Sequence, residues 1–387
     1  MPSTDEARPR PTIHPAIKRA GLFLMVNTFE TGGSERQFAV LAQNLSDSKF
    51  QIHLGCLSRH GALADQFAGV PQFPLGGSLF GLQSLRTRLN LRRHLRTNRV
   101  EIAHAFDFYA NLTLIPAARL AGLPVVIGSH RQLGDLMTRG QFRAQAAAFR
   151  LCDAVVCNSQ AAANSLVAAG LPRQKLEVIG NALPIADFDG VAPALERRSG
   201  TLRVGMVARM NAHYKNHAGF LRMAAAIHGK MPSVEFVLVG DGPLRGELEA
   251  QAAALGLQEH AIFPGDRRDI PAVLASLDVA VLTSDSESLS NVILESMAAR
   301  LPTVAYNVGG NAELIDKDRG ILVEAGREDE FAAAILRLLC DARLREHLGA
   351  NGRRFVEENF SLDRVCLRYE ELYLNLLDRK RRRNAAG

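Results

Sequence analysis

The sequence predicts an α/β protein built from two doubly wound domains. Short apolar runs alternate with amphipathic stretches along most of the chain, which is typical of parallel strands joined by helices. The alternation stops once, in a segment at 182–200 that is rich in Pro, Asp and Gly, and then begins again. A length of 387 residues also fits two domains better than one. We therefore expect two parallel sheets that face each other across a cleft.

The first half of the chain begins with a polar, proline-rich lead-in at 1–17, followed by a predicted domain at 18–190. The lead-in lacks the basic-then-apolar layout of a secretory signal, and we expect it to be disordered. After the first strand, the loop NTFETGGSE leads into a helix from about Ser34 to Asn44. Apolar runs predict the strands of this domain, which are 20–26, 51–57, 100–106, 124–130 and 154–159.

The second predicted domain, at 200–360, repeats the pattern. Its expected strands are 202–208, 234–240, 261–265, 279–284 and 302–307. Helical periodicity predicts helices around 216–229, 243–256, 269–276, 291–299 and 328–339. Both domains are thus expected to be Rossmann-like, and such sheets bind ligands beyond the carboxyl ends of their strands.

The last segment, 361–387, is predicted to form a helix from about Ser361 to Leu377, followed by a basic tail. One face of this helix carries apolar residues spaced three and four apart, which are Leu362, Val365, Tyr369, Leu372 and Leu376. Such a stripe is suited to docking on a neighbouring domain. The sequence leaves open which domain it meets.

Composition argues against several classes of protein. There is no apolar run of about 18 residues, so we expect no transmembrane helix. The five cysteines are odd in number and scattered, which argues against a disulfide framework or a structural zinc site and fits a reducing cytosol. With no tryptophan and few aromatic residues, a base-stacking platform for nucleic acid is not expected.

The net charge of +6 is unevenly distributed. Residues 1–190 carry +7, residues 191–378 carry −6, and the tail at 379–383 carries +5. The segment 82–99 contains six arginines and no acid. Four of the arginines share a helix face, beside a leucine stripe; these residues are Arg88, Arg92, Arg96 and Arg99, with Leu82, Leu85 and Leu89. Two readings stay open: a helix resting on anionic lipid headgroups, or a solvated basic helix whose leucines pack inward.

Two loops that follow predicted strands carry groups suited to phosphate. In TGGSERQ (31–37), the pair Gly32 and Gly33 allows close backbone approach, and the helix start that follows favours an anion. In VARMNAHYKN (207–216), Arg209 and Lys215 are placed to converge on a pyrophosphate. Read separately, the first loop is also compatible with a simple turn and the second with two solvated charges.

A third segment, SDSESLSNVILESMAARLPTVAYNVGGNAELI (284–315), places two carboxylates around a helix start. Glu287 precedes the helix, and Glu295 lies about one turn inside it. A carboxylate at the second place can accept hydrogen bonds from ribose hydroxyls, and one at the first from sugar hydroxyls. The amides of Ser290, Asn291 and Val292 lie where they can hold phosphate oxygens. Two solvated acids remain the alternative.

In combination these motifs resemble a known family. ESLSNVILE, the preceding VLTS, the following PTVAYNVGGNAELI and the upstream ARMNAHYKN resemble the retaining glycosyltransferases of family 4, which have the GT-B fold. The resemblance covers most of 20–375. It implies that Arg209 and Lys215 bind the diphosphate of a nucleotide-sugar, that Glu295 holds the ribose and that Glu287 holds the donor sugar. Gly33 would lie beside the phosphates.

The resemblance also suggests roles for histidines of the first domain. His130, at the end of a predicted strand, is similar to an active-site histidine that relatives place against the donor sugar. Without the resemblance, a hydrogen-bonded structural histidine is an equally good reading of this residue. His104 matches the first histidine of a His-x-His strand end, but Phe106 stands in place of the second. The loop ESLSN departs from the commoner EGFPN, with Ser288, Leu289 and Ser290 replacing Gly, Phe and Pro.

The function implied by the resemblance is retaining sugar transfer from a UDP- or GDP-sugar, without an obligatory metal or other cofactor. The acceptor would be a glycan, a lipid-linked glycan or a small molecule, in cell-surface polysaccharide or glycolipid synthesis. We expect a cytoplasmic protein, and whether it also touches the inner face of the membrane depends on which reading of 82–99 holds. Two alternatives share the fold: a sugar-nucleotide epimerase or phosphorylase, and a non-catalytic nucleotide-sugar-binding protein.

Overall fold

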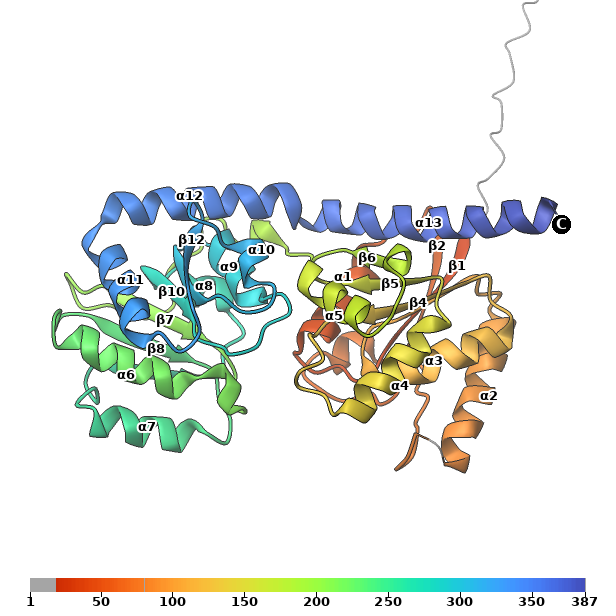
Figure 1. The fold of residues 1–387 in the computed structure, drawn as a ribbon, viewed down its shortest axis with the longest axis horizontal. Helices are drawn as coiled ribbons and strands as arrows, with labels where there is room; N and C mark the ends of the chain where they lie inside the picture. Colours follow the sequence, from red (N-terminus) through yellow and green to blue (C-terminus); the bar gives the residue numbers. More distant parts are fainter. Residues whose placement is uncertain (1–18, 80, 387) are drawn as a thin grey trace, which may run out of the picture.

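A computed structural model describes residues 19–79 and 81–386 of the chain. The molecule consists of two lobes, each built around one parallel sheet (Figure 1). This confirms the predicted α/β fold with two doubly wound sheets. The predicted lead-in at 1–17 lies outside the described residues.

The sheet of the first lobe contains, in the described part of the chain, six parallel strands. In spatial order they are β2 (Phe50–Cys56), β1 (Ala20–Val26), β3 (Ile102–Ala105), β4 (Val125–His130), β5 (Ala154–Cys157) and β6 (Leu176–Val178). The helices of this lobe are α1 (Gly33–Asn44), α2 (Leu82–Thr97), α3 (Phe108–Ala121), α4 (Arg139–Arg150) and α5 (Gln160–Ala168). β6 was not predicted, because three residues are too few to show a pattern.

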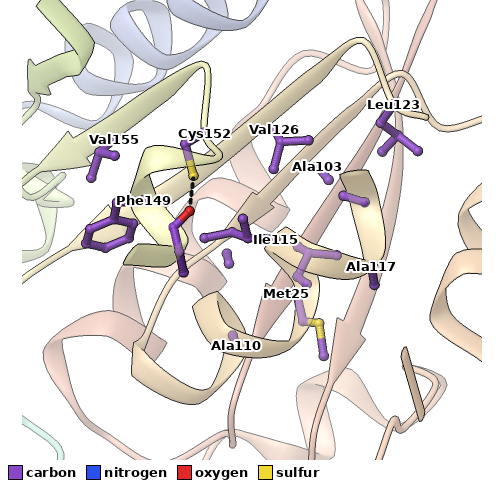
Figure 2. Packing of buried hydrophobic residues seen from close by; sticks show 14 of the residues in the cluster. Met25, Ala103, Ala110, Ile115, Ala117, Leu123, Val126, Phe149, Cys152 and Val155 are labelled. Carbon is purple, nitrogen blue, oxygen red and sulfur yellow. Dashed lines mark hydrogen bonds between the residues drawn. The ribbon is translucent and has the colours of Figure 1, made fainter. Parts of the chain in front are cut away.

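The strands of the first lobe are buried on both faces, which explains their continuous apolar runs. In β1, Phe23 and Met25 face α2 and α3, while Leu22, Leu24 and Val26 face α1 on the other side. Figure 2 shows the first of these cores, in which side chains from the sheet interlock with those of α3 and α4. This packing fixes the strand ends that carry the functional loops.

The second lobe has the strand order β12, β11, β10, β7, β8, β9 within the described residues. The strands are β12 (Gly320–Val323), β11 (Thr303–Tyr306), β10 (Val279–Leu282), β7 (Arg203–Val207), β8 (Glu235–Val239) and β9 (Ala261–Gly265). The helices are α6 (His217–His228), α7 (Arg245–Ala254), α8 (Ile270–Leu274), α9 (Asn291–Ala298), α10 (Asn311–Leu314), α11 (Glu328–Cys340) and α12 (Ala342–Asn359). β12, α10 and α12 are additions to the predicted elements.

The strand order identifies where a ligand fits. In the second sheet, the chain moves outward in one direction from β7 through β8 to β9, and in the other from β10 through β11 to β12. Neighbouring strands β7 and β10 therefore mark the switch point, where the loops that follow them diverge and leave a crevice. These loops carry the predicted phosphate-binding and sugar-binding residues.

A pair of long helices connects the lobes. α12 lies on the second lobe, and α13 (Leu362–Ala386) continues from it across the first lobe (Figure 1). The helix docks on the first domain, in contact with α1 and β4. Val365 and Tyr369 of the predicted stripe are buried there together with Tyr373 and Leu377, whereas the other predicted members, Leu362, Leu372 and Leu376, are only partly buried. The basic residues at 379–383 belong to the helix rather than to a separate tail. Lys380 pairs there with Asp153, at 2.6 Å between Nζ and Oδ1.

The structure of α2 contradicts one of the two readings of the basic segment 82–99, in which its leucines pack inward. Its leucines do not pack inward: the exposed fractions are 78% for Leu82, 54% for Leu85 and 47% for Leu89. The arginine face turns partly toward the domain instead, and Arg88 donates to the carbonyl oxygens of Leu79 and Leu112 at 3.0 and 3.1 Å. The residues of α2 that pack into the core of the lobe are instead Leu91 and Leu95, which are fully buried. Among residues 19–79 and 81–386, every helix is too short or too polar to span a bilayer.

Candidate active site

The predicted site residues of the second domain gather around two adjoining cavities between the lobes. One cavity has a volume of about 430 Å³ and is lined by Arg209, Lys215, Glu287 and the start of α9. Its opposite wall comes from the first lobe and includes Gly32 and Gly33. The second cavity, of about 810 Å³, contains Glu295 and the loop Gly240–Gly242 after β8.

Lys215 and Glu287 form an ion pair across the switch point. The distance between Lys215 Nζ and Glu287 Oε1 is 2.6 Å, and both side chains are mostly buried. Lys215 ends a 3₁₀ turn after β7, and Thr283 after β10 holds this turn by donating to the Lys215 carbonyl at 3.1 Å. The loops from the two neighbouring strands are thereby fixed to each other. The Lys215 ammonium group therefore lies at the cavity and is already paired with the Glu287 carboxylate.

The backbone at Glu287 is supported by the Gly-Gly loop at 309–310. The amide of Gly310 donates to the Glu287 carbonyl at 3.1 Å. A Cβ at Gly309 would lie 1.8 Å from that carbonyl oxygen, and one at Gly310 would lie 1.9 Å from the carbonyl oxygen of Ser288. Only glycine allows such an approach, so these two positions fix the loop that presents Glu287.

Arg209 extends from the end of β7 toward the first lobe. Its guanidinium donates to the hydroxyl of Thr31, in the loop before the glycine pair. Gly32 then serves as the N-cap of α1 without contributing a side-chain cap, so the first amides of α1 lie at the cavity. A Cβ on Gly33 would lie 3.4 Å from Asn291 Nδ2, which shows that the starts of α1 and α9 lie close together.

The start of α9 is built as predicted. Ser290 is the N-cap, and its hydroxyl accepts from the Ile293 amide at 3.3 Å. Ser290, Asn291 and Val292 all line the first cavity. The partial positive charge of a helix N-terminus is thus directed at the same space as the side chains of Arg209 and Lys215.

Glu295 lies one turn further along α9 and is held by a residue that the sequence did not reveal. Arg36 of α1 donates to it across the cleft, at 2.7 Å between Nη1 and Oε1. Burial raises the pKa of the Glu295 carboxyl, and the nearby Arg36 guanidinium acts in the opposite direction. The carboxylate therefore depends on a cation of the other lobe, 259 positions away in the sequence.

His130 is not in the cleft, contrary to what the family resemblance implied. Its side chain is fully buried within the first lobe and lines neither cavity. Nε2 lies 3.1 Å from Ser165 Oγ, and Nδ1 lies 3.1 Å from Gln145 Nε2. Burial lowers the pKa of this imidazole to about 4, so it is neutral at physiological pH. The reason is the pleat of β4: adjacent residues point to opposite sides, and Arg131 is the one that reaches the cavity.

His104 is also enclosed. Its Nδ1 lies 2.7 Å from the hydroxyl of Tyr373 on α13, and its Nε2 lies 2.7 Å from Ser129 Oγ. Phe106 packs against the imidazole, with ring centroids 4.4 Å apart, and it too is buried. This histidine therefore connects the sheet to the C-terminal helix rather than facing a substrate.

Several polar contacts cross from one lobe to the other beside the cavity. Ser288, the residue that replaces the more usual glycine, donates to Asn158 Oδ1 at 2.6 Å. Asn181 donates through Nδ2 to Asn291 Oδ1 at 2.5 Å. Glu313 accepts from the amides of Gln160 and Ala161 at the start of α5, both at 2.8 Å. These contacts hold the lobes together around the site, and partners this distant in sequence leave no local signal.

Comparison with known proteins gives family matches over both lobes. Residues 31–186 match Glycosyltransferase Family 4, and residues 201–341 match Glycosyl transferases group 1. The lipopolysaccharide core biosynthesis glycosyltransferase LpsE of Rhizobium meliloti (strain 1021) is 31% identical over 253 residues, covering 64% of this chain and 69% of LpsE. An Escherichia coli UDP-Gal:alpha-D-GlcNAc-diphosphoundecaprenol alpha-1,3-galactosyltransferase is 25% identical over 362 residues, covering 87% and 92% of the two chains.

A solved structure extends the similarity to nearly the whole fold. The crystal structure of Anabaena HepE in complex with UDP superposes with a TM-score of 0.80, at 21% identity, covering 92% of this chain and all of that one. At this identity the likeness concerns the fold alone. The two-lobed fold is thus shared with a protein whose structure was solved with UDP.

Proposed function

Since this chain belongs to the family 4 and group 1 glycosyltransferases and has their GT-B fold, we propose that its cleft binds a UDP- or GDP-sugar and transfers the sugar with retention of configuration. The observation that carries the proposal is the grouping of Arg209, Lys215 and the start of α9 around one cavity, with Glu287 and Glu295 on either side. This arrangement offers positive groups for a diphosphate, flanked by acceptors for sugar and ribose hydroxyls.

In the proposed complex the nucleotide lies across the switch point of the second sheet. Glu295 accepts hydrogen bonds from the ribose hydroxyls, in the cavity that also holds the Gly240–Gly242 loop. The diphosphate lies against Arg209, Lys215 and the amides of α9. Glu287 then faces the sugar, because it lines the first cavity, whereas Glu295 lines the second. The carboxylate of Glu295 must be ionised to accept two hydrogen bonds, and Arg36 favours that state.

Transfer requires stabilisation of the leaving group. The bond between the anomeric carbon and the diphosphate oxygen breaks, and its electron pair stays with the diphosphate. The acceptor hydroxyl oxygen bonds to the anomeric carbon, and its proton passes to an oxygen of the departing diphosphate. Arg209, Lys215 and the helix N-terminus are fixed around the developing negative charge, which is the most effective use of such groups. This set of positive groups supports a reaction without an obligatory metal ion.

We further propose that the acceptor is a glycan or lipid-linked glycan and that α2 touches an anionic membrane on the cytoplasmic side. The exposed leucines of α2 share their face with Arg86 and Arg93, which are also exposed. An apolar stripe flanked by cations matches the boundary between acyl chains and anionic headgroups. The relative from Escherichia coli is named for a diphosphoundecaprenol-linked substrate, which supports an acceptor of this class.

The membrane contact is tested by sedimentation with vesicles of phosphatidylcholine, with and without phosphatidylglycerol. We expect binding only to the anionic vesicles, weakened by salt and lost in Leu85→Ser/Leu89→Ser. Leu367→Ser is the matched control, because this leucine is 49% exposed on a different helix. Binding that ignores lipid charge and salt, or that is equal in the double variant, contradicts the proposal.

The transfer reaction is tested by measuring release of nucleoside diphosphate from a panel of UDP- and GDP-sugars, with and without lipid-linked and free glycan acceptors. We expect acceptor-dependent release, a product with the donor's anomeric configuration by NMR, and a loss of about a hundredfold or more in Glu287→Gln and Lys215→Ala. Interconversion of the sugar-nucleotide without release indicates an epimerase, and donor binding without turnover indicates a sensor. Unchanged transfer in both variants contradicts the assignment of the site.

A further inference from the structure

Arg131 is a cation of the first lobe that reaches the cavity and that the sequence patterns did not single out. It follows directly after the last residue of β4 and lines the same cavity as Arg209, Lys215 and Asn291. Its neighbour His130 points the other way into the core. The first lobe therefore presents a guanidinium, not an imidazole, to the space where we place the diphosphate.

The Arg131 guanidinium is held by a chain of contacts that ends at α9. Its Nη2 donates to Asn181 Oδ1, and Asn181 Nδ2 donates to Asn291 Oδ1 at 2.5 Å. Asn291 is the first residue of α9, whose amides we assign to the diphosphate. Burial lowers the pKa of the Arg131 guanidinium, and the neighbouring Tyr369 of α13 acts in the opposite direction. The guanidinium is thus connected through Asn181 to the second lobe, and it also interacts with α13.

The charge of Arg131 is not neutralised by the protein around it. Within residues 19–79 and 81–386, no carboxylate lies at ion-pair distance from this guanidinium, and its buried Nη1 has no hydrogen-bond partner. Glu35 is near enough to act on Arg131 electrostatically, and it also feels Arg209. Lys215, by contrast, already has Glu287 at 2.6 Å. An arginine remains charged at neutral pH, and a half-buried cation without an anionic partner is unfavourable until an anion arrives.

We propose that Arg131 binds the donor diphosphate from the first lobe, opposite Arg209 of the second. The inference rests on the proposed function and deepens it, because it makes the leaving-group site a clamp with one guanidinium from each domain. A planar guanidinium can donate two parallel hydrogen bonds to phosphate oxygens. The diphosphate then supplies the missing counter-charge of Arg131 and ties the two lobes together. Full stabilisation of the leaving group requires both lobes to be in place around it.

The test compares binding of UDP and of uridine, and of GDP and guanosine, to wild type, Arg131→Gln and Arg131→Lys by calorimetry. We expect Arg131→Gln to weaken binding of the diphosphate by about tenfold to a hundredfold, the usual cost of losing a charged hydrogen bond. Nucleoside binding should change by less than about twofold. Arg131→Lys keeps the charge but not the planar geometry, so it should recover part of the loss.

The ratio of diphosphate to nucleoside affinity separates binding from a structural effect. Arg119→Gln is the matched control, because Arg119 is a partly buried arginine of the same lobe that pairs with Asp153 and lines neither cavity. It should lower thermal stability and leave the ratio unchanged. An unchanged ratio in Arg131→Gln, or in Arg131→Lys if the first variant does not fold, overturns this inference alone. If wild type itself binds neither UDP nor GDP, the proposed function fails instead.

Discussion

Replacing His130 tests whether this residue has a structural role, as its contacts indicate, or a catalytic role, as the family resemblance implies. The Ser165 hydroxyl donates to the Ala162 carbonyl at 2.8 Å, so its oxygen accepts from Nε2–H of His130 at 3.1 Å. Gln145 donates to Nδ1, which fixes a neutral ring with its proton on Nε2. The ring also packs against Phe142 and Phe149, with centroids 6.0 Å away in each case. Every polar atom of the ring is thus used inside the first lobe.

The expected effect of His130→Ala is a loss of stability. Two buried hydrogen bonds contribute about 1 kcal/mol each, and their partners are left unsatisfied. Removing an enclosed ring adds about 2 kcal/mol through lost packing and the resulting cavity. We therefore expect a destabilisation of roughly 3–5 kcal/mol, which corresponds to a fall in Tm on the order of 10 °C for a lobe of this size.

The assay measures Tm and, well below it, the kcat and KM of sugar transfer for His130→Ala and His130→Asn. We expect kcat/KM within about threefold of wild type once only the folded fraction is counted, with the larger Tm loss in the alanine variant. An unchanged Tm with kcat reduced a hundredfold or more is the result that refutes the reasoning. It would place the imidazole at the reacting atoms, because losses of that size are typical of general acid–base groups.

The other predictions concern charge and stability. The pKa of His104 is lowered to about 3 and that of His130 to about 4. Because both histidines take up protons near pH 6.5 in the unfolded chain, we expect full stability above that pH and a loss as the pH drops toward 4; an unchanged Tm from pH 7 to 4.5 contradicts this. Arg36→Met leaves Glu295 buried without its cation, so we expect about 1–2 kcal/mol of destabilisation at pH 7 that shrinks as the pH falls through the carboxyl range, measured by urea unfolding. Arg203 and Glu235 form a buried ion pair at 2.7 Å, and we expect Arg203→Met alone to lower the free energy of unfolding by about 3–5 kcal/mol. Much of this loss should be recovered when Glu235→Leu is added, because no unpaired carboxylate then remains; a double variant less stable than the single one contradicts this explanation.

Much of the fold was predictable because its strands are buried on both faces. The runs at 20–26 and 202–208 are continuous and apolar, which a core strand between two helical layers requires. Strands of three or four residues, such as β6 and β12, are too short to carry such a signal. The docking of α13 on the first lobe could not be predicted, since an apolar stripe indicates that the helix packs against another surface but not which domain provides it.

The site was predictable where it depends on loops that follow strands. Arg209, Lys215 and Glu287 lie at the cavity because β7 and β10 are neighbours at a switch point. His130 lies away from the cavity because its side chain points into the first lobe, whereas the next residue along the chain, Arg131, lines the cavity. Pairs such as Arg36 with Glu295 depend on how the two lobes meet, and neither local sequence contains that information.

Thermal unfolding with UDP, GDP and ADP tests most directly whether the cleft is a nucleoside-diphosphate site. At a concentration a hundred times its Kd, the matching nucleotide stabilises the folded state by about 3 kcal/mol, which raises Tm by roughly 5–10 °C. We predict such a shift for UDP or GDP with wild type, and a much smaller one with Arg209→Ala and Lys215→Ala. No shift with any of the three nucleotides, or equal shifts in wild type and both variants, would contradict a diphosphate site in this cleft.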